Sequence, residues 1–160
     1  MFSYQQFQEL EGMGNYHPTD ENGHPEDAGF SVRPGPANTL IRAADAYMVG
    51  SNSRYTRNPA NADDISTYTE EHKEQLSDPS KYLGGWWPAG RERGELDVSS
   101  AFPRDVGGAL AAHHESTLQN QEAVGELDRM GAFVAAHPTV NPLDGVPAEV
   151  YEAHRQAQGQ

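Results

Sequence analysis

The chain has 160 residues, of which 36% are hydrophobic, and its 24 acidic residues outnumber its 11 basic ones, giving a formal net charge of −13. Phosphate backbones and anionic lipid surfaces repel such a charge, so direct binding to nucleic acid or to a membrane surface is not expected. No cysteine is present, which excludes disulfides, Cys-ligated zinc and thiol catalysis. The length suits one domain, or one domain with long arms.

Residues 1–28 are expected to form a polar N-terminal arm. Phe2, Tyr4 and Phe7 have the spacing of a short amphipathic turn or an extended anchor, so they are candidates for contacting a partner. Residues 12–27 are rich in turn-forming and polar residues and are not expected to contribute to a core. The first residues lack the basic and apolar regions of a secretory signal, and no apolar run is long enough to cross a bilayer.

Residues 29–128 are expected to fold as one α+β domain. Apolar residues that alternate with polar ones predict strands, and apolar residues recurring every three or four positions predict helices. In chain order we expect strands at 29–32 and 46–50, a helix at 63–76, strands at 82–87 and 95–99, a helix at 103–118, and a strand at 121–127.

This β-β-α-β-β-α-β order favours a short, mostly antiparallel sheet with two helices on one face. Asp63 or Asp64 has the character of an N-cap for the first helix, and Pro103 suits the first turn of the second. Residues 129–160 are expected to be a C-terminal tail with short helices at 130–136 and 147–156.

The seven histidines do not have the spacing of a metal site. His113 and His114 are adjacent, so on a helix their side chains point in different directions, and His72 lies on the apolar face of its predicted helix. No pattern of the HExxH type occurs. We therefore expect neither a metal ion nor another cofactor.

Four residues are candidates for a general acid and base, should the chain be a small enzyme: Asp97, His113, His114 and Glu126. No serine lies in a GxSxG-type turn, and neither glycine pair has the sequence context of a phosphate-binding loop. We therefore predict no catalytic residue, and these four are retained as an alternative.

Two adjacent tryptophans, Trp86 and Trp87, lie in the clearest predicted strand. Successive side chains of a strand face opposite ways, so one tryptophan can anchor the core while the other points outward. An outward tryptophan is a typical interface hot spot. Burial of both by the same chain is the competing interpretation. Both join the three N-terminal aromatic residues as partner-binding candidates.

Five short motifs follow one another along the chain: GFSV at 29–32, YMV at 47–49, YLGGW at 82–86, LDVS at 96–99 and NQEAVGEL at 120–127. In this order they resemble a small domain that recurs in phage and prophage proteins of actinobacteria, where the pattern runs GF(T/S)V, GY(M/A)V, YLGGW, YLDVS and NQxAIxDL. The chain departs from it at Ala46, where glycine is usual, at the additional Trp87, and at Gly125 and Glu126. The resemblance implies a phage of a high-GC Gram-positive host and no established activity.

Three functions follow as hypotheses. The first is a virion-associated protein of the minor-capsid or decoration type that binds other structural proteins, since long polar arms suit contacts with neighbouring subunits. The second is an intracellular effector that inhibits a host enzyme or defence factor, with acidity as nucleic-acid mimicry. The third is a small enzyme. We expect a protein partner, no membrane association, and location in the virion or the host cytoplasm.

Overall fold

The computed structural model describes residues 1–139 and has the expected mixed α+β architecture. Four α-helices, a short 3-10 helix and seven strands lie within these residues, two strands more than the sequence predicts. The strands follow the order β2-β1-β4-β5-β3-β6-β7 in one sheet, and every strand pairing described below is antiparallel. Contacts divide the chain into two compact units, Met1–Arg42 with Asn52–Ser99 (unit 1), and Ala43–Ser51 with Ser100–Gln160 (unit 2).

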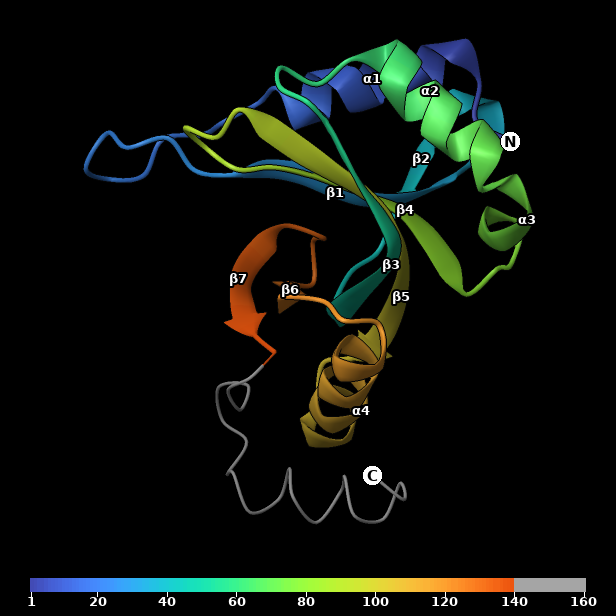
Figure 1. Ribbon diagram of the computed structural model, residues 1–160. Helices are drawn as coiled ribbons and strands as arrows, with labels where there is room; N and C mark the ends of the chain where they lie inside the picture. The colour runs from blue at the N-terminus through green and yellow to red at the C-terminus, as the bar shows by residue number, and fades with distance from the viewer. Residues whose placement is uncertain (140–160) are drawn as a thin grey trace. The chain divides into compact units, whose positions relative to one another are not determined.

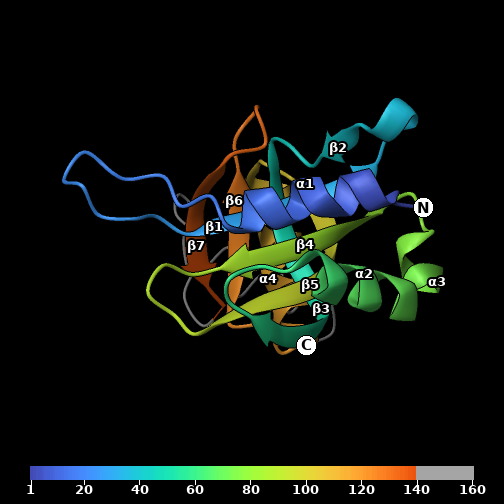
Figure 2. The same cartoon turned by 90° about the horizontal axis from the view of Figure 1, so that it is seen from above.

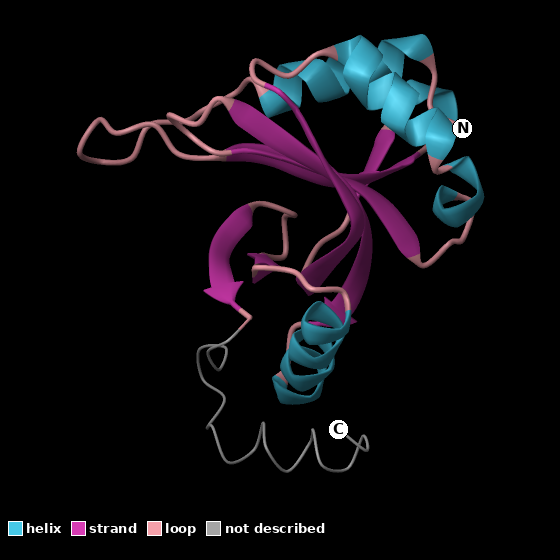
Figure 3. Ribbon diagram, in the orientation of Figure 1, coloured by secondary structure: helices cyan, strands magenta, loops and turns pink. Residues whose placement is uncertain are grey.

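Unit 1 contains α1, α2 and α3 and the larger part of the sheet, whose elements can be followed in Figures 1 and 3. Its elements are α1 (Tyr4–Gly14), β1 (Ala28–Pro34), η1 (Pro36–Asn38), β2 (Leu40–Arg42), the end of β3 (Ala46–Arg57), α2 (Ala62–Glu71), α3 (Lys73–Leu76), β4 (Lys81–Trp87) and the start of β5 (Arg93–Pro103). Strand β1 lies between β2 and β4, with Phe30 opposite Gly85. Viewed from above, α1 runs across β1 and β4, which it contacts (Figure 2).

Helix α1 lies within the segment expected to be a polar arm. Ser3 and Gln6 form a capping box, in which the Ser3 hydroxyl accepts from the Gln6 amide and the Gln6 side chain accepts from the Ser3 amide. One face of the helix buries Phe7 and Leu10 in the core. Whether 1–28, 29–128 and 129–160 act as separate parts stays a prediction, but residues 4–14 belong to the fold.

The core of unit 1 lies between the helices and one sheet face. Its fully buried side chains are Leu10, Val32, Ile65, Tyr68, Leu83, Trp87, Leu96 and Val98. Gly14 allows α1 to approach this core closely, because a Cβ there would lie 2.7 Å from Ala60 Cβ and 2.9 Å from the Trp87 ring. The glycine at this position is therefore required by packing.

The helix predicted at 63–76 is divided at His72 into α2 and α3. Its N-cap is Asn61 and not Asp63 or Asp64, as predicted. The Asn61 side-chain oxygen accepts from the amides of Asp63 and Asp64 at 2.9 and 3.2 Å, which places both aspartates in the first turn, where the helix dipole favours acidic residues.

Unit 2 contains the start of β3, the end of β5, α4 (Val106–Leu118), β6 (Ala123–Leu127) and β7 (Phe133–Pro138). Helix α4 begins later than predicted: Pro103 ends β5, and Asp105 is the N-cap that accepts from the Gly108 amide at 2.7 Å. The core of unit 2 consists of Tyr47, Val49 and Val124 packed with three residues of α4, namely Ala109, Leu110 and Ala112.

Residues 130–136, predicted to be a short helix, instead form a turn and most of β7. Asp128 accepts from the amides of Met130 and Ala132, and Gly131 has a φ of +81°, so the chain reverses and β7 pairs with β6. The helix predicted at 147–156 lies outside the described residues.

Candidate functional site

Three segments of unit 1 come together at one end of its sheet, on the left in Figure 1. They are residues 15–27 between α1 and β1, residues 58–61 between β3 and α2, and residues 88–92 between β4 and β5. We call these segments, with the adjoining residues Tyr55, Trp86 and Arg93, the loop end. Loops on a rigid scaffold are the usual carriers of binding function.

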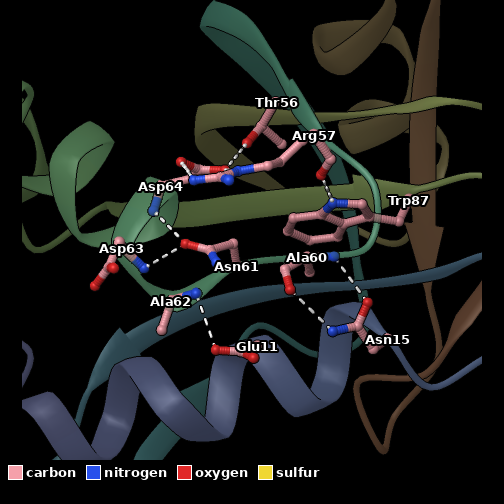
Figure 4. Close-up of polar contacts among 10 residues, drawn as sticks. All are labelled: Glu11, Asn15, Thr56, Arg57, Ala60, Asn61, Ala62, Asp63, Asp64 and Trp87. Carbon is pink, nitrogen blue, oxygen red and sulfur yellow. Dashed lines mark hydrogen bonds and ion pairs between the residues drawn. The ribbon is translucent and has the colours of Figure 1, made fainter.

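Side-chain hydrogen bonds join the first two segments. Asn15 lies after the last turn of α1, and its side-chain amide donates to the Ala60 carbonyl at 2.9 Å and accepts from the Ala60 amide at 2.7 Å (Figure 4). Glu11, one turn earlier on α1, accepts from the Ala62 amide at 3.0 Å. These three bonds attach the end of α1 to the segment that leads into α2.

The segment at 88–92 is held in the same way. Asp27 accepts from the Trp86 indole nitrogen at 3.1 Å and from the Ala89 amide at 2.9 Å. The Asn58 side chain donates to the Arg91 carbonyl at 2.7 Å. Each segment is thus bonded to at least one of the others, so the loop end is ordered before any partner binds.

Residues 15–27 have internal order, although the sequence predicts a polar stretch without a core. Asp20 accepts from the amides of Asn22 and His24, both at 2.9 Å. A β-bridge joins Thr19 to Pro25, and the Glu26 amide donates to the Pro18 carbonyl at 2.7 Å. The segment is a closed loop held by local bonds.

Aromatic side chains are exposed at the loop end. Tyr16 is 70% exposed, Tyr55 62% and Trp86 37%. The Arg93 guanidinium lies over the Tyr55 ring, 4.2 Å from its centroid, within the range of a cation–π contact. Tyrosine, tryptophan and arginine are the residue types enriched in binding hot spots.

A hollow of about 380 Å³ adjoins the loop end along β3 and α2. Arg57 Nε and Nη2 donate to Asp64 at 2.6 and 2.9 Å, as Figure 4 shows, and Arg54 pairs with Glu71. The lining residues are Arg54, Tyr55, Thr56, Arg57, Asp64, Thr67, Tyr68 and Leu96.

Three ionisable groups of this hollow have displaced pKa values. The hydrogen bond from Arg57 holds the pKa of Asp64 below its usual value, and the same bond raises the pKa of Arg57. Burial raises the pKa of the Tyr68 phenol, whose hydroxyl donates to the Asn52 carbonyl at 2.8 Å. All three keep one protonation state near neutral pH, which suits recognition and not proton transfer.

The five partner-binding candidates from the sequence are placed differently from one another. Trp87 is fully buried, with its indole nitrogen donating to the Arg57 carbonyl at 3.1 Å, and Phe7 lies in the core. Phe2 packs against that core, 5.6 Å from the Phe7 ring centroid. Tyr4 is 70% exposed at the start of α1, and Trp86 is the outward tryptophan.

The candidate acid Asp97 lies in unit 1, on β5. It is partly buried against Gly84 and accepts a hydrogen bond from the Ser99 hydroxyl. Burial raises the pKa of Asp97 from 3.8 to about 6, against the opposing effect of the Ser99 bond. Ser99 is itself buried, so this pair does not present a nucleophile to solvent.

The other three candidates lie in unit 2. Glu126 accepts from Arg104 Nε and Nη2, both at 2.7 Å, and its second oxygen lies 2.7 Å from His137 Nε2. His113 is buried on α4, and His114 follows it. Burial opposes ionisation of Glu126, but bonds from His137 and Arg104 hold its pKa below its usual value. This carboxylate joins β6 to β7 through its contact with His137.

Sequence reasoning missed His137 and the loop end. His137 directly precedes Pro138 in a segment predicted to be outside any strand, so nothing indicated its contact with Glu126. Tyr16, Tyr55 and Arg93 lie far apart in the sequence, and the composition of residues 15–27 gave the only signal that a surface loop was present.

Within residues 1–139, no group of three or more His, Asp or Glu side chains is placed to hold a metal ion. None of the described helices is both long and apolar enough for a membrane span. Comparisons found no matching family model, no similar curated protein and no similar solved structure.

Proposed function

We propose that this chain is a non-catalytic accessory protein of a phage particle, and that it binds another structural protein through the loop end. The main observation behind this proposal is that the loop end exposes aromatic side chains on segments that hydrogen bonds join to one another. These bonds link Asn15 with Ala60, Asp27 with Trp86, and Asn58 with Arg91. The phage setting comes from the sequence resemblance.

Order before binding supports a binding role for physical reasons. A free loop must give up conformational freedom when it binds, at a cost of about 0.5–1.5 kcal/mol for each immobilised side chain. At the loop end, hydrogen bonds inside the folded chain have met much of this cost.

The electrostatics favour binding over catalysis at this surface. The hollow offers guanidinium, hydroxyl and phenol groups that keep one protonation state near neutral pH. Asp97 titrates nearer neutrality, but its described hydrogen bond is with a buried serine. A general acid–base pair facing one hollow is not formed by these residues.

The test is the copy number of the chain in purified particles, measured by quantitative mass spectrometry for the wild type and two variants. Tyr16→Ala removes an exposed ring of the loop end, and Tyr4→Ala is its matched control, equally exposed at the far end of α1. We expect a fixed copy number for the wild type and Tyr4→Ala, and a reduction of about tenfold for Tyr16→Ala.

Two results would overturn the proposal. Absence of the wild-type chain from particles removes the virion role, and enrichment of a single host protein by the tagged chain then favours the effector hypothesis. Equal incorporation of Tyr16→Ala and the wild type removes the loop end as the contact surface.

A further inference from the structure

We propose that the loop end recognises carboxylate side chains of its partner, through Arg93 stacked on Tyr55 and Arg91 beside it. We call these three residues the arginine–tyrosine surface. The inference deepens the proposed function and rests on it, because it gives the chemistry of the protein segment that the loop end binds.

The first argument is the pairing of the basic residues. Arg54, Arg57, Lys73 and Arg104 each lie within ion-pair distance of a carboxylate of the same chain. In the part of the chain that the structure describes, no carboxylate lies within 4.0 Å of the side-chain nitrogens of Arg91 or Arg93.

In this chain, whose acids outnumber its bases 24 to 11, the exposed Arg42 and Arg129 likewise have no described carboxylate partner. Arg91 and Arg93 differ from these two in lying two positions apart at the turn between β4 and β5, with Arg93 over the Tyr55 ring. Two guanidiniums this close in the sequence, neither with a described carboxylate partner, give this turn basic groups that the acidic chain as a whole has few of.

The second argument is the geometry of Arg93. Its guanidinium carbon lies 4.2 Å from the Tyr55 ring centroid, as expected for a cation packed on the ring. A guanidinium stacked in this way keeps its N–H groups in its own plane, directed away from the ring. Those donors fit the two oxygens of a carboxylate, and the stack reduces the side-chain freedom lost on binding.

Neighbouring contacts hold the arginine–tyrosine surface in position. The Asn58 side chain donates to the Arg91 carbonyl and so holds the Arg91 backbone. Arg57, which precedes Asn58, donates two hydrogen bonds to Asp64. Arg57 therefore neutralises Asp64, the acid lining the adjoining hollow. An incoming carboxylate meets available guanidiniums instead of this local acid.

A protein segment fits this surface better than a nucleic acid does. Nucleic-acid binders commonly make about six to ten phosphate contacts, whereas this surface offers two guanidiniums without a carboxylate partner. The net charge of −13 also opposes approach of a long phosphate backbone. A few carboxylates on a protein segment need only the local contacts.

The experiment is a titration of the full chain, labelled with ¹⁵N-arginine, with a short peptide of alternating Glu and Gly at physiological ionic strength. The side-chain Nε–H signal of Arg93 is the readout. We expect the peptide to shift this signal, and the Gln–Gly analogue, which has no charge, to leave it unchanged. Arg93→Gln should weaken peptide binding by about threefold or more.

Arg42→Gln is the matched control, since Arg42 is an exposed arginine of β2 in the same unit and has no described carboxylate partner. Arg42→Gln should bind the peptide as the wild type does. The inference would be overturned if the peptide left the Arg93 signal unchanged, or if Arg93→Gln and Arg42→Gln weakened peptide binding equally. It would also be overturned if a thymidine oligonucleotide bound more tightly than the peptide.

The two proposals can fail separately. If the chain has a fixed copy number in particles but its Arg93 does not respond to the peptide, the carboxylate preference fails and the virion role stands. If the peptide binds at Arg93 but the chain is absent from particles, the virion role fails and the surface chemistry stands.

Discussion

Replacing Asp97 by Asn tests the electrostatics of the sheet in unit 1. Asp97 is partly buried on β5, accepts from the Ser99 hydroxyl and lies against Gly84. Asparagine has nearly the same shape, and its side-chain oxygen can keep the bond from Ser99. The substitution therefore removes the ionisable group and leaves the packing almost unchanged.

The sign and size of the effect follow from the pKa of Asp97. Burial raises this pKa from 3.8 to about 6, so the folded state favours the neutral carboxyl. Ionisation of Asp97 therefore lowers the free energy of unfolding. The effect is absent below the pKa that the carboxyl has in the unfolded chain and complete above its pKa in the folded protein. At about 1.4 kcal/mol for each unit of pKa, the full cost is about 3 kcal/mol. About half of it is present at about pH 5.

The assay is urea unfolding followed by tryptophan fluorescence at about pH 5 and about pH 8. Asp97→Asn should be more stable than the wild type at both pH values, and its advantage should grow by about 1.5 kcal/mol from the lower to the higher. Glu92→Gln, at an exposed carboxyl of the 88–92 segment, is the control and should show no such growth. An advantage independent of pH, or a variant less stable at pH 8, would refute the reasoning.

Two further substitutions test unit 2 and the start of α2. Glu126→Gln should lower the free energy of unfolding by about 2 kcal/mol at neutral pH, because it removes charged hydrogen bonds to Arg104 and His137. Thermal unfolding of the variant and the wild type measures this difference. Since the pKa of Glu126 is lowered in the fold, the cost should shrink as the pH falls through that pKa, and a cost that is constant with pH would contradict the pairing. Asn61→Ala should lower the unfolding free energy by about 1 kcal/mol through loss of the N-cap, and an unchanged urea midpoint would show that the cap contributes nothing.

The sequence predicted those elements whose apolar pattern is long and regular. Ile65 and Tyr68 placed α2, and the alternation around Leu96 and Val98 placed β5. Helix α1 was missed because only Phe7 and Leu10 of its central residues are strongly apolar; its stability comes from the capping box and from packing on the sheet.

The strand β7 and the loop end could not be predicted, for different reasons. A short apolar run such as that at 133–136 is compatible with either a helix or a strand, and pairing with β6 decides between them. The loop end depends on bonds such as Asn15 to Ala60 and Asp27 to Ala89, which join residues 45 and 62 positions apart. Local patterns carry no information about such contacts.

Neither unit is a single stretch of sequence, and this limits how the protein can be dissected. The chain passes between the units after Arg42, Ser51 and Ser99, and the strands β3 and β5 each contribute residues to both. No single cut therefore separates the two units: a chain ended after Ser99 keeps all of unit 1 but also carries Ala43–Ser51 of unit 2, and the cut divides β5. Loss of stability in one unit should be transmitted along these shared strands, so point substitutions, and not fragments, are the appropriate way to assign roles to each.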